Sequence, residues 1–257
     1  MSGYTLPHDL AGERTRLALM SELLDPLHRR FLEKLGVRPG WRCLEVGCGN
    51  GSISQWLAAR VAPDGHVVAS DIETSYLQNL HAPCLEARRL DIVEDRVEEG
   101  AYDLVTARAV LHHLPSREKA VQQMITALKP GGVLLSIEPD FLPATVAEPE
   151  PLHAFWQAWL RWSVSEGIDY FIGRKMPALL SRLGLENVGG EGSTAMYAGS
   201  SPWSTYWLDT VQELRPALLK SGDATENLLS SFQTAYNDPQ IWTSAITFVA
   251  SWGNKPT

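Results

Sequence analysis

The sequence feature that most constrains the fold is a glycine-rich segment, LEVGCGNGS, at residues 44–52. A short apolar run precedes it, and an apolar-periodic segment that contains Ile53 and Leu57 follows it. This succession predicts a strand, a glycine loop and the start of a helix. Such a unit opens the α/β folds that bind nucleotides, and in those folds the ligand lies at the loop.

The spacing of the glycines narrows the class of ligand. Gly47, Gly49 and Gly51 are separated by single residues, and Glu45 stands two residues before the first of them. A dinucleotide fingerprint would need G-x-G-x-x-G, which would place its third glycine at Ser52, and a P-loop would need a Lys-Ser/Thr pair that is missing here. The spacing therefore favours a different adenosine ligand, approached closely by a backbone without Cβ atoms.

The rest of the chain alternates strand and helix patterns. Further strands are expected at 66–71, 84–90, 102–106 and 133–140. The alternation predicts an α/β fold with a doubly wound, mostly parallel sheet. Pro26 is expected to break the N-terminal helical segment in two. We expect one domain over 1–257, composed of an N-terminal helical lid (1–35), a core (36–140), cap helices with part of the sheet (141–237) and a final strand at or near the sheet edge (238–257).

Composition narrows the partners and the compartment. The formal charge is -8 and no Lys/Arg block is present, so a nucleic-acid partner is not expected. Cys43, Cys48 and Cys84 form no CxxC pair, which predicts reduced thiols and no metal site. No apolar run reaches membrane-spanning length, so we expect a cytoplasmic protein without a membrane partner.

These motifs, in this order, resemble those of class I S-adenosylmethionine (SAM)-dependent methyltransferases, of the group that includes the ubiquinone/menaquinone-biosynthesis type. The resemblance implies a seven-stranded Rossmann-like methyltransferase sheet with a helical cap inserted after strand five. It also implies SAM as the cofactor and S-adenosylhomocysteine as its product. The motifs that carry it are LEVGCGNGS, Asp71 at the end of strand two, LDI at 90–92, YDLVTARAVLHHL at 102–114 and LKPGG at 128–132.

The same resemblance implies which residues hold the cofactor. A carboxylate at Asp71 would accept hydrogen bonds from both ribose hydroxyls, as its counterpart does in dinucleotide folds. Asp91 would bind the exocyclic amine of adenine, although this acid also suits a plain acidic turn. Arg108 ends strand four, where a backbone carbonyl faces the SAM ammonium, and it equally suits a salt bridge. The expected cofactor contacts are Tyr4, Glu45, Gly47, Gly49, Gly51, Asp71, Ile72, Asp91, Ile92, Ala107, Arg108 and His113.

Two further residues are candidates for catalysis. His112 has a pKa range that suits a general base, with packing as the alternative. Asp140 follows strand five on the edge where ligands of open α/β sheets bind, with turn capping as the alternative. Tyr4 and Arg16 resemble parts of the N-terminal lid of a subgroup of small-molecule methyltransferases. In that subgroup a glutamine is common at the position where this sequence has Met20.

Aromatic residues after strand five suggest the acceptor. These side chains suit either core packing or the wall of an apolar pocket. We therefore expect a methyltransferase that acts on an apolar or aromatic small molecule, with a homodimer left open. The alternative hypotheses are a SAM-binding cyclase, a non-catalytic SAM-binding protein and, with less support, a tRNA or protein methyltransferase. The aromatics are Trp156, Trp159, Trp162, Trp203, Tyr206 and Trp207.

Overall fold

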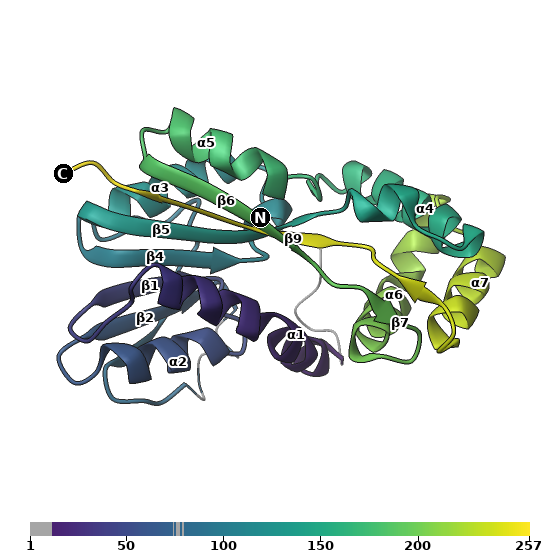
Figure 1. Cartoon of the computed structure of the whole chain (residues 1–257), viewed down its shortest axis with the longest axis horizontal. Helices are drawn as coiled ribbons and strands as arrows, with labels where there is room; N and C mark the ends of the chain where they lie inside the picture. Colours follow the sequence, from purple (N-terminus) through teal and green to yellow (C-terminus); the bar gives the residue numbers. More distant parts are fainter. Residues whose placement is uncertain (1–11, 74, 76–77, 79) are drawn as a thin grey trace.

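The computed structural model describes residues 12–257 except positions 74, 76, 77 and 79, and its centre is a seven-stranded sheet (Figure 1). The strand order is β3-β2-β1-β4-β5-β9-β6. The prediction for Tyr4 lies outside the described residues. The strands are β1 (Arg42–Val46), β2 (His66–Asp71), β3 (Leu85–Arg89), β4 (Tyr102–Arg108), β5 (Leu128–Asp140), β6 (Glu186–Thr194) and β9 (Thr247–Asn254).

The pairing of the strands confirms the predicted α/β fold. β1 pairs in parallel with β2 on one side and with β4 on the other. β9 runs antiparallel to both β5 and β6, so the sheet is mostly parallel and the last strand lies next to the edge strand. Because the chain leaves β1 in one direction and returns beside it at β4, a crevice opens where the carboxyl ends of these strands meet.

The strands are apolar on both faces because helices cover both faces. Cys43 belongs to the core on the side of α1 (Glu13–Lys34) and α2 (Ser52–Val61). The adjacent Leu44 belongs to a second core with residues of α3 (Arg117–Ala127) and α5 (Met176–Arg182). Adjacent strand residues point to opposite faces, so a near-continuous apolar run is what a doubly covered strand needs.

A helical cap lies beyond the carboxyl ends of the strands (Figure 1). Two separate segments build it, one after β5 and one between β6 and β9. β5 and β6 lead from the sheet into the cap and β9 returns from it, so the position of the cap is tied to the sheet. The cap contains η3 (Pro143–Val146), α4 (Glu150–Ser165), α6 (Pro202–Ser221), α7 (Glu226–Asn237) and a small ribbon of β7 (Tyr197–Ala198) with β8 (Trp242–Thr243). None of the described helices is long and apolar enough to cross a membrane.

The expected break at Pro26 is wrong, since α1 continues through this residue from Glu13 to Lys34. An interior proline removes one backbone hydrogen bond and costs a helix about 3 kcal/mol. Leu24 and Phe31, on either side of the proline, are both buried in the core beneath the sheet. Burying such side chains contributes roughly 1.5–3 kcal/mol each, which offsets the cost.

Candidate functional site

A cavity of about 380 Å³ lies at the carboxyl ends of the strands, enclosed by the sheet loops, α1 and the cap. Leu17 and Met20 of α1 contribute to its wall. Gly51, Ala107 and Asp140 do not line it. Ten of the residues predicted from the sequence line it together: Glu45, Gly47, Gly49, Asp71, Ile72, Asp91, Ile92, Arg108, His112 and His113.

The glycine loop follows β1 and forms the floor of one end of the cavity. Gly47 has φ +68°, and a Cβ atom there would collide with the side chain of Val110. Both observations explain the glycine: residues with a side chain rarely adopt positive φ, and their Cβ atom would have no room beside Val110. Gly51 has φ +74° at the start of α2, where a Cβ would collide with Leu80. Its role is therefore to turn the chain into the helix.

The acid that ends β2 holds the glycine loop in place. The backbone N–H of Gly49 donates to Oδ2 of Asp71 at 2.9 Å, and the N–H of Glu73 donates to Oδ1 at 3.0 Å. Each carboxylate oxygen accepts about two hydrogen bonds, so both oxygens retain capacity toward the cavity. Oδ1 of Asp91 accepts from the N–H groups of Val93 at 2.9 Å and Glu94 at 3.3 Å.

A buried carboxyl group, Glu45, lies beside the same loop. Ser54 of α2 donates a very short hydrogen bond to its Oε2 atom. The hydroxyl of Ser70 in β2 donates to the backbone carbonyl of Glu45 at 2.8 Å. Burial raises the pKa of Glu45 to about 7, against the opposing hydrogen bond from Ser54 and the charge of Arg108. Glu45 therefore joins β1, β2 and α2 next to the loop.

Arg108 connects β4 to α1. Its Nη1 atom lies 2.8 Å from Oδ1 of Asp25, and both side chains are only 9% exposed. Asp25 also accepts from Ser52 at 3.0 Å and from Arg29 at 3.0 Å. Arg108 thus forms the salt bridge that was the alternative to a cofactor contact. The ion pair is buried, and its Arg108 side lines the cavity.

His112 is paired with Glu138, which comes from the carboxyl end of β5. The ring Nδ1 of His112 lies 3.0 Å from Oε2 of Glu138, and both residues are buried. Oε1 of Glu138 also accepts from the N–H groups of Val110 at 3.1 Å and Leu111 at 2.9 Å. The two histidines lie in the 3-10 turn η2 (Leu111–His113), and the ring centroids of His112 and His113 are 3.8 Å apart. Among the described residues, no cluster of His, Cys, Asp or Glu is placed to hold a metal ion.

Burial dominates the protonation of this pair. It lowers the pKa of His112 to about 3, and the charges of Arg117 and Arg16 act in the same direction. It raises the pKa of Glu138 to about 7, against the hydrogen bonds that its carboxylate accepts from the backbone. Because desolvation disfavours charge on both groups, His112 is neutral near pH 7.

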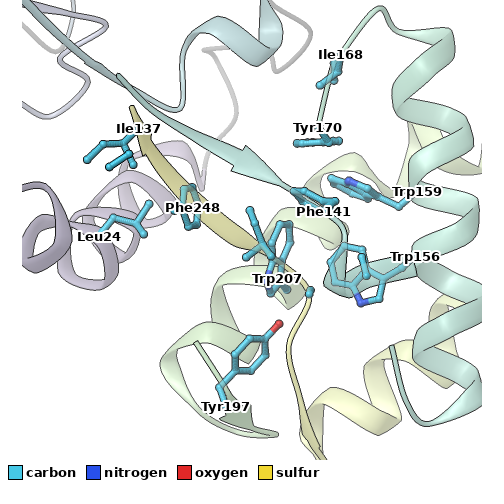
Figure 2. Packing of buried hydrophobic residues seen from close by; sticks show 14 of the residues in the cluster. Leu24, Ile137, Phe141, Trp156, Trp159, Ile168, Tyr170, Tyr197, Trp207 and Phe248 are labelled. Carbon is cyan, nitrogen blue, oxygen red and sulfur yellow. The ribbon is translucent and has the colours of Figure 1, made fainter. Parts of the chain in front are cut away.

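Aromatic rings form the far end of the cavity. Phe141 follows β5, and its ring centroid lies 4.2 Å from that of Tyr170 and 5.7 Å from that of Trp207 on α6. Tyr206 and Phe248 also line the cavity. Figure 2 shows Phe141 at the end of the strand, between Tyr170 and the tryptophans.

Of the two alternatives left open for the tryptophans of α4, core packing and a pocket wall, the structure shows core packing. They lie in the interior of the cap, where they pack on one another and on α6 and α7 (Figure 2). Trp203 also packs against the core and is absent from the cavity wall. Of the six aromatics considered from the sequence, only Tyr206 and Trp207 line the cavity. The buried tryptophans are Trp156, Trp159 and Trp162.

Comparison with known proteins assigns the family. A model described as a methyltransferase domain matches residues 14–189, more than half of the chain. The chain belongs to this methyltransferase domain family. The ubiquinone/menaquinone biosynthesis C-methyltransferase UbiE of Vibrio parahaemolyticus is 32% identical over 134 residues, which cover 47% of this chain and 50% of that enzyme. The chain therefore spans about half the length of the curated relatives that it matches.

Solved structures share the fold of this methyltransferase domain. Phosphoethanolamine N-methyltransferase 2 of Haemonchus contortus, solved with S-adenosylhomocysteine, matches with TM-score 0.56 and 14% identity, over 95% of this chain and 53% of that one. The [4+2]-cyclase SpnF matches with TM-score 0.54 and 16% identity, over 91% and 82% of the two chains. At these identities the likeness shows the fold alone.

Asp140 lies apart from the cavity of the methyltransferase domain. Its carboxylate forms a two-pronged ion pair with Arg174, with Nη2 at 2.6 Å from Oδ1. Oδ1 also accepts from the N–H of Leu142 at 2.9 Å. This geometry matches the turn-capping alternative, and the position offers no carboxylate oxygen to a ligand in the cavity.

Three residues of the site have no clear signal in the sequence of the methyltransferase domain. Glu138 stands near the end of the predicted strand 133–140, and that position is the nearest hint of its role in the sequence. Asp25 is 83 residues from Arg108, with no pattern that connects them. Tyr170 lies in a connection between α4 and α5, where sequence periodicity gives no orientation.

Proposed function

We propose that this protein binds SAM and transfers its methyl group to an apolar or aromatic small molecule. The observation that carries the proposal is a single cavity with two chemically different ends. One end has a glycine loop and two strand-end acids, Asp71 and Asp91. The other has an aromatic wall of Phe141, Tyr170 and Trp207.

The loop end fits the adenosine and amino-acid parts of SAM. Gly47 and Gly49 both have positive φ and lie in the cavity lining, so the backbone of the loop faces the ligand at this end. Asp71 has remaining acceptor capacity for ribose hydroxyls, and Asp91 has capacity for the amine of adenine. When bound, SAM supplies a methyl group on a positively charged sulfur. An aromatic wall beside that position would exclude water and stabilise the cation.

The aromatic end fits an apolar acceptor better than a phosphorylated one. Recognition of phosphate groups uses several converging Arg or Lys side chains. The Arg and Lys residues among the described lining are Arg16 and Arg108, and Arg108 is already paired with Asp25. Large apolar ring faces instead supply contact area without charge.

Titration calorimetry with SAM and an assay with methyl-labelled SAM test the proposal. We expect SAM to bind, and Asp71→Ala to weaken binding by about 1–3 kcal/mol because ribose hydroxyls would lose their partner. Asp64→Ala, in the exposed turn after α2, serves as the control and should change the affinity little. Absence of SAM binding in the wild-type protein would overturn the proposal. Binding without label transfer to any of a panel of phenols, quinols and amines would point to a non-methylating use of SAM.

A further inference from the structure

The hydrogen bonds around Glu138 leave one arrangement of protons for the pair when the carboxyl group is ionised. Its carboxylate accepts from the N–H groups of Val110, Leu111 and His112, and it also faces the Nδ1 atom of His112. With all neighbours being donors, an ionised Glu138 requires a proton on Nδ1 of His112. A neutral imidazole carries only one ring proton, so Nε2 then bears a lone pair.

Nε2 is on the side of the ring away from Glu138, and His112 forms part of the cavity wall. The residues that the structure describes supply no hydrogen bond to it. Its surroundings are aromatic: the ring centroid of Tyr170 lies 5.4 Å away, and Phe141 packs on Tyr170. Within the described part of the chain this lone pair has no donor, and a ligand would bring one.

We propose that Glu138 positions His112 as a general base and that the acceptor is therefore a hydroxylated, otherwise apolar molecule, such as a phenol. This inference rests on the proposed methyl transfer and names the acceptor class for it. Glu138 is a positioning residue because it acts through His112. An acceptor hydroxyl would donate its hydrogen bond to Nε2 and place its oxygen at the aromatic end of the cavity.

The step balances in atoms and charge. The hydroxyl proton passes to Nε2 of His112, and the oxygen electron pair forms the new bond to the methyl carbon. The bond between that carbon and sulfur breaks with its electrons on sulfur, which leaves neutral S-adenosylhomocysteine. The Nδ1 proton of His112 passes in turn to Glu138, so His112 stays neutral and the sulfonium charge is cancelled by the carboxylate charge that Glu138 loses.

The pairing of Glu138 with His112 also predicts how the protonation of Nε2 depends on pH. When Glu138 is protonated, its O–H has only Nδ1 of His112 to donate to, so the ring proton moves to Nε2 and the base is lost. Burial raises the pKa of Glu138 to about 7, so the basic form gains population as pH rises through that value. The charged neighbours that bear on His112 are Arg117 of α3, Arg16 of α1 and Asp169 of the connection before η4 (Gly173–Lys175), with His113 in ring contact.

Nitrogen NMR of protein labelled with ¹⁵N-histidine tests the pair without any reaction. At pH 8 we expect His112 to show a protonated Nδ1 and an unprotonated Nε2. Glu138→Gln should shift His112 to a mixture of tautomers, with folding checked by circular dichroism. A protonated Nε2 in the wild type at pH 8 would overturn the proposal even if the variant fails to fold.

Histidine 66 provides a matched control for this measurement. His66 of β2 also faces a glutamate, with Nε2 at 3.3 Å from Oε2 of Glu86 on β3, but this pair is half-exposed. His66→Gln removes that pair and also its NMR signals. We expect it to leave the His112 tautomer and the ligand binding described below unchanged.

Two probe ligands test the acceptor class. At pH 8 we expect 4-methylphenol, which keeps its proton at that pH, to bind the protein loaded with S-adenosylhomocysteine at least tenfold more tightly than 4-methylanisole, which has the same ring without the donor. His112→Leu should abolish that difference, and so should a pH well below 7. Equal binding, or no binding of the phenol, contradicts the hydroxyl acceptor. SAM binding and methyl transfer to an acceptor without a hydroxyl group would then leave the proposed function intact.

Discussion

Carboxyl groups at the strand ends differ in role because their surroundings differ. Asp71 and Asp91 face the cavity and accept hydrogen bonds from backbone N–H groups. Glu45 and Glu138 are buried, and burial raises the pKa of each to about 7. Asp140 is neutralised by Arg174 outside the cavity. All five lie in the sheet region where the sequence indicates acids, but only the environment of each decides its chemistry.

Glu45 should make the stability of the fold depend on pH. Its folded-state pKa of about 7 exceeds the usual 4.5, so the folded protein holds this proton more tightly than the unfolded chain does. Its contribution is thus fully present below pH 4.5 and is lost as pH rises toward 7. We expect Glu45→Gln to gain roughly 3 kcal/mol in unfolding free energy, relative to wild type, between pH 4.5 and 7.5. Urea unfolding across that range measures the difference.

Glu86 is a control of opposite sign for that experiment. Burial is the largest single influence and raises the pKa of Glu86, but the hydrogen bonds from Arg88 and His66 and the charges of these residues together outweigh it and lower the pKa. Its contribution is therefore present above the usual carboxyl pKa and is lost as pH falls. Glu86→Gln should consequently show no gain relative to wild type as pH rises. A flat difference for Glu45→Gln would mean that Glu45 is solvated in the folded state.

At the scale of elements, α1 closes one side of the cavity through a buried ion pair. Arg108 of β4 and Asp25 of α1 lie 2.8 Å apart, and Tyr206 of α6 accepts from Arg16 of α1 at 3.4 Å. α1 therefore contacts both the sheet and the cap. Its position depends on partners far away in the chain, which explains why helical spacing alone did not predict its continuity.

Removal of Asp25 should destabilise the protein strongly. Asp25→Ala leaves the buried guanidinium of Arg108 without its counter-charge, which typically costs about 3–5 kcal/mol. Glu33→Ala is the matched control, because Glu33 pairs with Arg60 on the exposed side of the same helix. That change should cost less than about 1 kcal/mol. Urea unfolding midpoints compare the two, and equal losses would mean that Arg108 is hydrated in solution.

At the scale of the molecule, the sheet and the cap form different ends of the cavity. The loops of the sheet form the end of the cavity assigned to the cofactor, and cap residues form the opposite end. The cap keeps its shape through its own aromatic core: the ring centroids of Trp156 and Trp207 lie 4.9 Å apart, and those of Phe155 and Phe232 lie 3.8 Å apart. The wall that Trp207 presents therefore rests on packing within the cap.

Substitution of two tryptophans distinguishes a residue of the cavity wall from a residue of the cap interior. Trp207→Leu should lower kcat/KM for the acceptor by more than tenfold while changing the Kd for SAM by less than about threefold, because the acceptor would use that wall more than SAM does. Trp159→Ala should instead lower the unfolding free energy by about 3–5 kcal/mol, the usual cost of a large cavity in a core. Calorimetry with SAM, acceptor kinetics and urea unfolding on both variants distinguish these effects. A parallel loss of SAM affinity in Trp207→Leu would contradict the division.

The sequence by itself determined the fold class, the order of the first five strands and the loop end of the cavity. Those features are local: a glycine loop, a strand-end acid and the apolar period each act within a few residues. The fold places the ends of consecutive parallel strands at one edge, so Gly47, Asp71 and Asp91 meet without further information.

Only the tertiary structure decided the pairs and the pocket walls. His112 meets Glu138 across 26 positions and Arg108 meets Asp25 across 83, contacts that no spacing rule predicts. The facing of Trp207 toward the cavity, and of Trp159 away from it, depends on how the cap helices pack. Both residues look alike in the sequence because apolar periodicity shows that a side chain is buried, whereas the neighbouring elements decide what it is buried against.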